Sequence, residues 1–222
     1  MSTQPMAELV AGIVPPDFKP VPVDHEAASL SYLAEARKRD AIARFEASVP
    51  PAMRASDWAH PTLALNREQI GRVLAHKVGQ RGLLLTGRTG RGKTRAMWAL
   101  LRRLACEEAR DIRYFHAQDW FAQLQGCLNF GRDDARGWVE AVARRPIVFI
   151  DDLGQEAMQT ARSEWALSWF LRFLDIRVSE RLPLYVTTNL DAQGIAERGA
   201  SSVRGDPMVR RLIEICEPVK FV

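Results

Sequence analysis

The spacing of hydrophobic and polar residues divides the first part of the chain into two regions. Residues 1–23 contain five prolines and no regular apolar period. Proline removes an N–H donor from helices and sheets, so this composition favours a flexible, extended arm. Residues 24–47 place leucine, isoleucine and phenylalanine near one stripe with charges opposite, which is typical of an amphipathic helix. Pro50 and Pro51 end this pattern.

Further along, short apolar runs alternate with longer amphipathic stretches. The predicted strands are residues 82–86, 111–116, 147–150, 184–187 and 218–222. The predicted helices are residues 66–77, 93–110, 118–124 and 162–180. Asn66 is a candidate N-cap of the first of these helices, and the glycine- and charge-rich stretch 126–137 is predicted to be a loop. Strands that alternate with helices favour a parallel sheet covered on both faces.

The composition is that of a globular protein, with 222 residues of which 47% are hydrophobic and 26% charged. This length fits one α/β domain with a short appendage. No apolar run approaches the roughly 20 residues of a membrane helix, and the first residues lack the features of a signal peptide, so we expect no membrane association. Three scattered cysteines argue against disulfides and zinc and favour a cytoplasmic protein. His25, His60, His76 and His116 share no metal-ligand spacing.

The net charge of +4 permits nucleic-acid binding but does not establish it, and codon bias explains the excess of arginine over lysine equally well. Six arginines, with Phe130 available for stacking, are candidates for a single-stranded DNA track. They are Arg102, Arg103, Arg132, Arg136, Arg144 and Arg145. A solvated helix face is an equally good interpretation of each.

The strongest chemical signal is GRTGRGKT, residues 87–94, which fits the phosphate-loop pattern G-x-x-x-x-G-K-[ST]. Its glycines let successive backbone N–H groups converge on phosphate oxygens. Lys93 can then reach the β- and γ-phosphates of ATP, and the Thr94 hydroxyl can bind Mg²⁺. A helix N-terminus directly after the loop also favours an anion. The predicted nucleotide-binding residues are Gly87, Arg88, Thr89, Gly90, Arg91, Gly92, Lys93, Thr94 and Arg95.

Two further polar strand ends complete the predicted site. PIVFIDDLG ends a buried strand with Asp151 and Asp152, at the end of a parallel sheet where ligands bind. We expect Asp151 to hold Mg²⁺, directly or through water, and Asp152 to orient or deprotonate the attacking water. LYVTTNL ends with Asn189, whose amide can bond both the γ-phosphate and that water. A simple strand-ending turn is the alternative for this segment.

Together, GRTGRGKT, FIDDLG, a helix end at Arg177 and VTTNL resemble the DnaC/IstB group of AAA+ ATPases, which are helicase loaders and transposition helpers. The resemblance runs from about residue 48 to the C-terminus. It implies an α/β P-loop AAA+ core, with a five-stranded parallel sheet in the order 5-1-4-3-2 between helices and no C-terminal lid domain. The expected organisation is an arm (1–23), a helical partner-binding segment (24–50) and the ATPase domain (51–222).

The resemblance also implies an ATP site at a boundary between subunits of a homo-oligomer, into which a neighbour inserts an arginine. By position this arginine finger is Arg211, with Arg210 and Arg204 as weaker candidates. Such an arginine neutralises charge that develops during phosphoryl transfer. An exposed basic helix face is the alternative interpretation of all three.

The leading functional prediction is an ATP-dependent, DnaC-like helicase loader that binds a replicative helicase and single-stranded DNA. Hydrolysis would be slow and stimulated by partners, and ATP would act as an assembly switch. The helix over 24–47 would bind the helicase, although it could equally pack on its own body. The alternatives are an IstB-like transposition helper, a nucleotide-gated scaffold and a P-loop small-molecule kinase. The kinase would leave VTTNL unexplained.

Overall fold

The computed structural model describes residues 25–56, 58–108, 111–154, 163–191, 194 and 202–222, in two compact units, Met1–Ala36 and Arg37–Val222. Helix α2 (His25–Ser48) begins in the first unit and ends in the second, close to the helix predicted over 24–47. The predicted arm, 1–23, lies outside the described residues.

The second unit is built on five strands, all paired in parallel. They are β1 (Gly82–Gly87), β2 (Ile112–His116), β3 (Ile147–Asp151), β4 (Leu184–Thr187) and β5 (Cys216–Phe221). Their order, β2-β3-β4-β1-β5, is the predicted 5-1-4-3-2 read from the other edge of the sheet. Because every strand runs in the same direction, the polar residues that follow the strands gather along one edge of the sheet.

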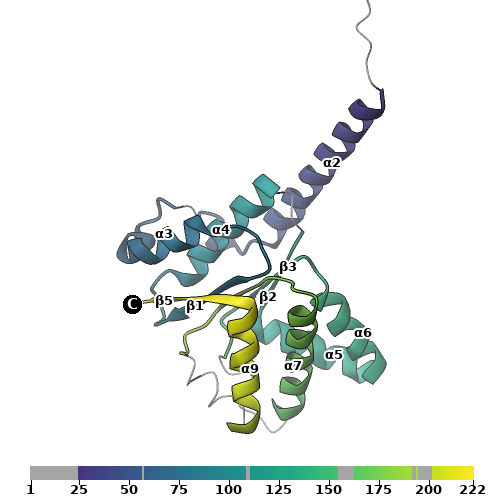
Figure 1. Cartoon of the computed structure of the whole chain (residues 1–222), viewed down its shortest axis with the longest axis vertical. Coiled ribbons are helices and arrows are strands. Elements are labelled where there is room, and N and C mark those ends of the chain that lie inside the picture. Colours follow the sequence, from purple (N-terminus) through teal and green to yellow (C-terminus); the bar gives the residue numbers. More distant parts are fainter. Residues whose placement is uncertain (1–24, 57, 109–110, 155–162, 192–193, 195–201) are drawn as a thin grey trace, which may run out of the picture. The chain divides into compact units, whose positions relative to one another are not determined.

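Helices cover both faces of this sheet. They are η1 (Pro51–Met53), η2 (Pro61–Asn66), α3 (Arg67–Ala75), α4 (Lys93–Glu108), α5 (Ala117–Phe130), α6 (Arg132–Ala143), α7 (Ser163–Ser179) and α9 (Ser202–Ile215). Helices α3 and α4 lie on one face, and α5, α6, α7 and α9 on the other (Figure 1). None of them, within the described part of the chain, has the length and apolar character needed to cross a bilayer.

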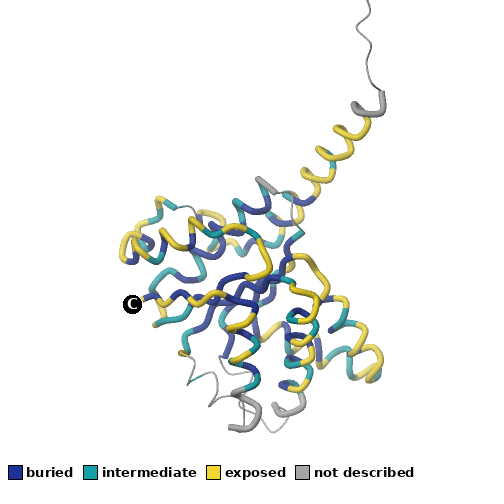
Figure 2. Tube along the Cα trace, in the orientation of Figure 1, coloured by how far each residue is buried: buried dark blue, intermediate teal, exposed yellow. Residues whose placement is uncertain are grey.

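The alternation of side chains along the strands divides the interior into two cores. In β1, Leu84 packs into the core beneath α5, α6, α7 and α9, whereas Leu83 and Leu85 pack into the core beneath α3 and α4. Strands β3 and β4 are buried along their whole length, and Figure 2 shows the inner part of the sheet as buried. Residues that alternate between two apolar layers are typical of a parallel sheet enclosed by helices.

The prediction of a loop over residues 126–137 is wrong, because this stretch is helical on both sides of Gly131. Gly126 and Gly137 weaken a helix only modestly, and apolar neighbours of theirs pack against the core under α5 and α6. The chain needs one residue to turn, and the N–H of Gly131 donates to the carbonyl oxygen of Cys127. Packing therefore overrides the composition that favoured a loop.

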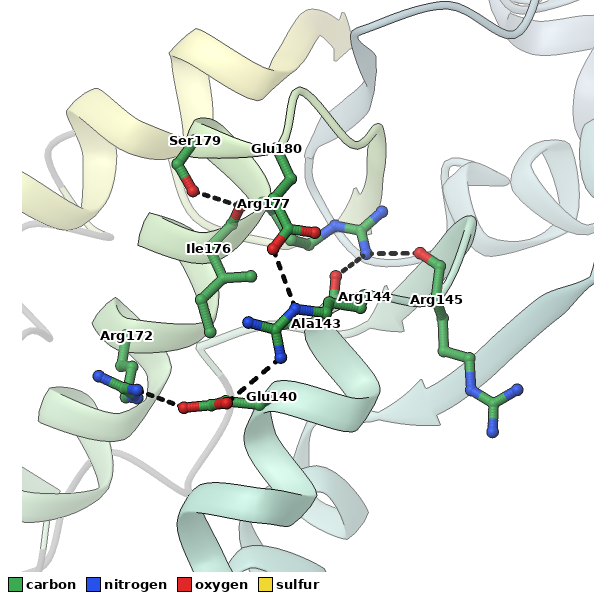
Figure 3. A network of polar contacts seen from close by, with 9 residues as sticks. All are labelled: Glu140, Ala143, Arg144, Arg145, Arg172, Ile176, Arg177, Ser179 and Glu180. Atoms are coloured by element: carbon green, nitrogen blue, oxygen red, sulfur yellow. Dashed lines mark hydrogen bonds and ion pairs between the residues drawn. The ribbon is translucent and has the colours of Figure 1, made fainter.

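Arg177, near the end of α7, holds several segments together from inside the protein. Its side chain is 0% exposed, and its guanidinium donates to the carbonyl oxygens of Ala143 (2.8 Å), Arg145 (2.9 Å) and Pro183. Figure 3 shows the contacts with Ala143 and Arg145. Burial lowers the pKa of Arg177 to about 10, which still leaves it charged at neutral pH. Backbone carbonyls accept from both terminal nitrogens, whereas its buried Nε has no hydrogen-bond partner among the described residues, so this arginine holds the surrounding segments together.

Ion pairs link the outer surfaces of α6 and α7 above this buried arginine (Figure 3). Arg144 bridges Glu140 (3.2 Å) and Glu180 (3.0 Å), and Arg172 pairs with Glu140. Hydrogen bonds from Arg172 and Arg144 lower the pKa of Glu140. The two helices are thus held together by a polar network outside and by Arg177 inside.

Candidate functional site

The predicted phosphate loop joins β1 to α4 at the carboxyl edge of the sheet. Gly87 ends β1 with φ +132°, and a Cβ atom there would lie 2.1 Å from the carbonyl oxygen of Phe221 in β5, so only glycine fits. Residues 88–92 turn, and α4 begins at Lys93. Within the described part of the chain, the backbone N–H groups of 88–92 donate to no protein acceptor. Such N–H groups, placed before a helix, attract an anion.

Lys93 is held at the centre of the loop. It is 5% exposed, and its Nζ donates to the carbonyl oxygens of Gly87 (2.8 Å) and Arg88 (2.9 Å) and to Oδ1 of Asn189 (2.7 Å). Burial lowers the pKa of Lys93, while Asp152 and Asp151, at the end of β3, act in the opposite direction. These neutral oxygens are partners that phosphate oxygens can replace with a stronger, charged interaction.

Asp151, the last residue of β3, lies against Thr94 at the start of α4. Its Oδ1 accepts hydrogen bonds from the hydroxyls of Thr94 (2.9 Å) and Thr187. Burial raises the pKa of Asp151, and the hydrogen bonds from Thr187 and Thr94 oppose that shift. The two residues predicted to bind Mg²⁺ are therefore in direct contact. Their carboxylate and hydroxyl oxygens are hard donors, which fit this ion.

Asp152 follows β3 in an uncommon backbone conformation. Its φ of +55° lies in the left-handed region, which few residues other than glycine adopt. Thr187 supports this turn twice: its Oγ1 accepts from the N–H of Asp152 (3.0 Å), and its carbonyl accepts from the N–H of Leu153 (2.9 Å). Strained conformations of this kind occur at functional sites, where the surroundings hold them in place.

The carboxylate of Asp152 has a polar neighbour on either side. Nδ2 of Asn189 donates to its Oδ1 (3.4 Å), and Nε2 of His116 lies 3.9 Å from its Oδ2. Nδ1 of His116 accepts from the N–H of Gln118 (3.4 Å), so the proton of the neutral imidazole is on the nitrogen that faces Asp152. The sequence assigned no role to His116. Its place at the end of β2, beside β3, was the signal that could have found it.

A pocket of about 360 Å³ opens beside these groups. It is lined by Met53, Thr62, Thr89, Gly90, Gly92, Lys93, Thr94, Arg95, Asp152 and Asn189. Most of these residues were predicted from the phosphate loop and the two strand ends. Met53 and Thr62 were not, because they reach the pocket only through the way η1 and η2 fold against the loop.

Three arginines of the predicted loop have different places. Arg88 and Arg91 are not among the described residues that line the pocket. Arg95 does line it, although its guanidinium also donates to Oγ of Ser56 (3.3 Å) and to the carbonyl oxygen of Ala52 (3.3 Å). Arg95 therefore connects the pocket to the segment that follows α2.

The predicted N-cap position of Asn66 is confirmed, but its side chain does not make the capping hydrogen bond expected of such a residue. Its Nδ2 donates instead to the carbonyl oxygen of Arg91 (3.1 Å), and its Oδ1 accepts from the N–H of Val222 (3.3 Å). The preference of asparagine for helix starts thus predicted where α3 begins, whereas tertiary contacts determine the hydrogen-bond partners of the Asn66 side chain.

The predicted arginine finger lies apart from the residues around the pocket. Arg211 in α9 is not among the described residues that line the pocket of its own chain. Its guanidinium forms an ion pair with Asp175 of α7 and donates to the carbonyl oxygen of Pro207 (3.3 Å). Arg210 is exposed, and the side chain of Arg204 lies outside the described residues.

This chain is similar to known proteins in fold, but its sequence matches no known family. No protein-family model matches this sequence, and no curated protein matches it. Solved structures do match. The crystal structure of DnaI has a TM-score of 0.60 and 22% identity, over 79% of this chain and 92% of that one. A crystal structure of the DnaC helicase loader has a TM-score of 0.59 and 20% identity, over 78% and 100%. AMPPCP-bound DnaA from Aquifex aeolicus has a TM-score of 0.55 and 15% identity, over 73% and 47%.

The fold of this chain, with its five-stranded parallel sheet in the order β2-β3-β4-β1-β5, is therefore similar to the folds of DnaI and of the DnaC helicase loader. The resemblance predicted from GRTGRGKT, FIDDLG and VTTNL, and the strand order that it implied, are confirmed at the level of the fold.

Proposed function

We propose that this protein is an ATP-dependent helicase loader of the DnaC type, in which ATP controls assembly. One observation carries the proposal: a line of hydrogen bonds runs from Lys93 through Asn189 to Asp152, beside the contact between Thr94 and Asp151. The group that would hold the phosphates, the group that would accept a proton and the amide between them thus border one pocket. Phosphoryl transfer requires this combination of positioning and charge.

ATP would enter with its phosphates over the loop. The N–H groups of residues 88–92 would surround the β-phosphate, and Lys93 would exchange its bond with Asn189 for γ-phosphate oxygens. Thr94 and Asp151 would hold Mg²⁺, which when bound neutralises charge on the phosphates. Asn189, once released, is free to bond the γ-phosphate and the attacking water.

Hydrolysis would follow by attack of that water on the γ-phosphorus. The bond from this phosphorus to the oxygen of ADP breaks, and the proton of the water passes to the carboxylate of Asp152. In this proposal an arginine from a neighbouring copy neutralises the developing charge. Arg211 is the leading candidate and Arg210 and Arg204 are the alternatives. Turnover would therefore depend on assembly and would be slow in the isolated chain.

The exposed part of α2 supports a role in binding the helicase. Leu30, Tyr32 and Leu33 are large apolar side chains, and all three are exposed. Exposed apolar side chains on one helix are typical of a docking surface. We propose that the segment 24–50 contacts a replicative helicase in the cytoplasm through this exposed part, while Phe45 and Val49 stay packed in the core with α3 and α4. The ATPase domain, 51–222, would bind nucleotide and DNA.

Of the residues predicted to line a DNA track, fewer are available to contact DNA than the sequence indicated. Five of its six arginines contact groups of their own chain; these are Arg102, Arg103, Arg136, Arg144 and Arg145. Phe130 is 85% exposed at the turn between α5 and α6, directly before Gly131 and Arg132. An aromatic ring beside a cation is suited to stack on a base of single-stranded DNA.

The test is a pull-down and size-exclusion experiment with the replicative helicase of the same organism, with and without ATP and Mg²⁺. We expect retention of the helicase that depends on ATP and is lost in Lys93→Ala, and ATP turnover that single-stranded DNA stimulates. Capture of a transposase with duplex DNA, instead of the helicase, would favour the IstB-like alternative. Retention that is identical without ATP and in Lys93→Ala would reject the assembly switch.

A further inference from the structure

Asn66 joins three segments that are distant in sequence. It is 2% exposed and lies where η2 meets α3. Its Nδ2 donates to the carbonyl oxygen of Arg91 in the phosphate loop, and its Oδ1 accepts from the N–H of Val222, after β5. A carbonyl can only accept and an N–H can only donate, so these partners fix the orientation of the amide. A side chain with both a donor and an acceptor is needed here.

The segment that carries Asn66 also packs against the outer side of the loop. A Cβ atom on Gly92 would lie 3.0 Å from Cδ2 of Leu63 and 3.4 Å from Thr62, which shows how closely η2 approaches the loop backbone. Gly92 and Thr62 both line the pocket. Helix η2 therefore packs directly against the loop backbone, and its Thr62 shares the wall of the pocket with Gly92.

The geometry of a peptide group connects Asn66 to the pocket. The carbonyl of Arg91 and the N–H of Gly92 belong to one planar trans peptide, in which C=O and N–H point in opposite directions. Since Asn66 holds the carbonyl of Arg91, the N–H of Gly92, a residue that lines the pocket, is directed away from the Asn66 amide.

We propose that Asn66 is a positioning residue for the phosphate loop. By holding the carbonyl of Arg91, it keeps the N–H of Gly92 turned towards a bound phosphate. This inference rests on the proposed binding of ATP and adds a residue outside the phosphate-loop motif to that site. Without Asn66, the peptide between Arg91 and Gly92 can rotate, and a phosphate ligand has to select the correct orientation.

The experiment measures ATP binding and turnover, in the presence of Mg²⁺, for the full chain and its variants. Asn66→Ala removes both hydrogen bonds. Asn66→Asp keeps the acceptor for Val222 but places a carboxylate oxygen against the carbonyl of Arg91. We expect the Kd for ATP to rise about tenfold in Asn66→Ala and more in Asn66→Asp. The kcat at saturating ATP should stay within about twofold, because the groups that would perform the reaction are intact.

The matched control is Arg72→Ala. Arg72 on α3 also binds the region of β5, donating to Oε1 of Glu217 (2.8 Å) and to the carbonyl oxygen of Pro218 (3.2 Å), and it makes none of the described contacts with the loop. Its removal should leave the Kd unchanged. Melting temperatures, measured in parallel, ensure that binding is compared among folded proteins.

Each result decides the inference. If the unaltered chain binds ATP and both Asn66 variants bind it equally well while melting at lower temperature, Asn66 is only structural and the inference is wrong. An equal loss of affinity in Arg72→Ala would also overturn it, by assigning the effect to the packing of α3 on β5. If Asn66→Asp fails to fold, Asn66→Ala decides. If the unaltered chain binds no ATP, the proposed function fails, and this inference fails with it.

Discussion

The carboxyl edge of the sheet and helix α9 differ in how completely they are assembled within one chain. At the sheet edge, Lys93 already bonds Asn189, and Asn189 already bonds Asp152. In α9, by contrast, Arg211 is paired with Asp175, a carboxylate on a neighbouring helix. The first region holds its polar groups in mutual contact around a pocket, whereas the second holds its arginine in a salt bridge outside it.

This difference indicates where control can be exerted. Groups that form one partly buried hydrogen-bond network, anchored on the buried Lys93, respond together, because moving one leaves its partners unsatisfied. A half-exposed ion pair contributes little and can be exchanged for another anion. We therefore expect binding of ATP to depend on the single chain and hydrolysis to depend on a second copy.

The largest expected effect concerns hydrolysis. Asp152→Asn and Arg211→Ala should each lower kcat about a thousandfold, because one removes the proton acceptor and the other the neutralising charge. A mixture of the two variants should recover part of the activity, since some interfaces then combine an intact Asp152 with an intact Arg211. The measurement is ATP turnover against mixing ratio.

A matched control for this experiment mixes Asp152→Asn with Lys93→Ala subunits that carry an intact Arg211. In these mixtures no site has both an intact Lys93 and an intact Asp152, so they should remain inactive. If size exclusion shows mixed assemblies of Asp152→Asn and Arg211→Ala without any recovery, the shared site is excluded.

The next effect concerns binding. Lys93→Ala should weaken ATP binding about a hundredfold, because charge-assisted hydrogen bonds to two phosphates are lost. Titration calorimetry with ATP and Mg²⁺ measures this. Lys77→Ala, which removes an exposed lysine after α3, is the control and should bind normally. Normal affinity in Lys93→Ala would refute the phosphate-loop assignment.

A smaller effect should appear in stability. Burial raises the pKa of Asp151, so the folded protein disfavours its ionised form. The penalty is absent while the carboxyl is protonated, below its ordinary pKa, and grows as pH rises through the raised value. Asp151→Asn should therefore stabilise the free protein by about 1 kcal/mol at neutral pH and lose that advantage in acid.

The measurement is the melting temperature of the unaltered protein and of Asp151→Asn, without nucleotide, from acid to neutral pH. The same variant should lose the stabilisation that ATP with Mg²⁺ gives to the unaltered protein. A melting temperature that does not respond to pH in the expected direction would show that Asp151 is not destabilising in the free site.

The smallest expected effect concerns the ion pair between Arg211 of α9 and Asp175. Asp175→Asn removes the partner of Arg211, and we expect turnover to rise about twofold to threefold at protein concentrations where assembly is incomplete. Glu180→Gln is the control, since it breaks another exposed ion pair, with Arg144, one residue beyond the end of α7. An equal increase in both variants would mean that the pair with Asp175 does not restrain Arg211.

The sequence was most informative where local pattern and chemistry coincide. Buried apolar runs followed by GRTGRGKT, FIDDLG and VTTNL predicted three strands and the polar groups at their ends. Parallel pairing then brings Thr94, Asp151 and Asn189 to one edge of the sheet, as the structure confirms for their positions. Their chemical roles remain predictions.

The sequence was least informative where distant segments meet. Nothing in the residues around Asn66 indicates that its amide bonds Arg91 and Val222 rather than its own helix. The pairing of Arg211 with Asp175 likewise depends on how α7 lies beside α9. The stretch 126–137 was misjudged because glycine content is visible in the sequence and the packing of α5 and α6 is not.

The two glycines that bound β1 restrict how the molecule can transmit a signal. A methyl group on Gly82 would lie 2.0 Å from the carbonyl oxygen of Leu184, just as one on Gly87 would meet Phe221. The backbone of β1 thus approaches both of its neighbours, β4 and β5, too closely for a side chain at either end of the strand. The helix that follows the loop, α4, contacts the end of α2, since its Arg102 pairs with Glu46 (2.9 Å). We therefore expect a change at the proposed nucleotide site to move α4 and the end of α2 more than β1.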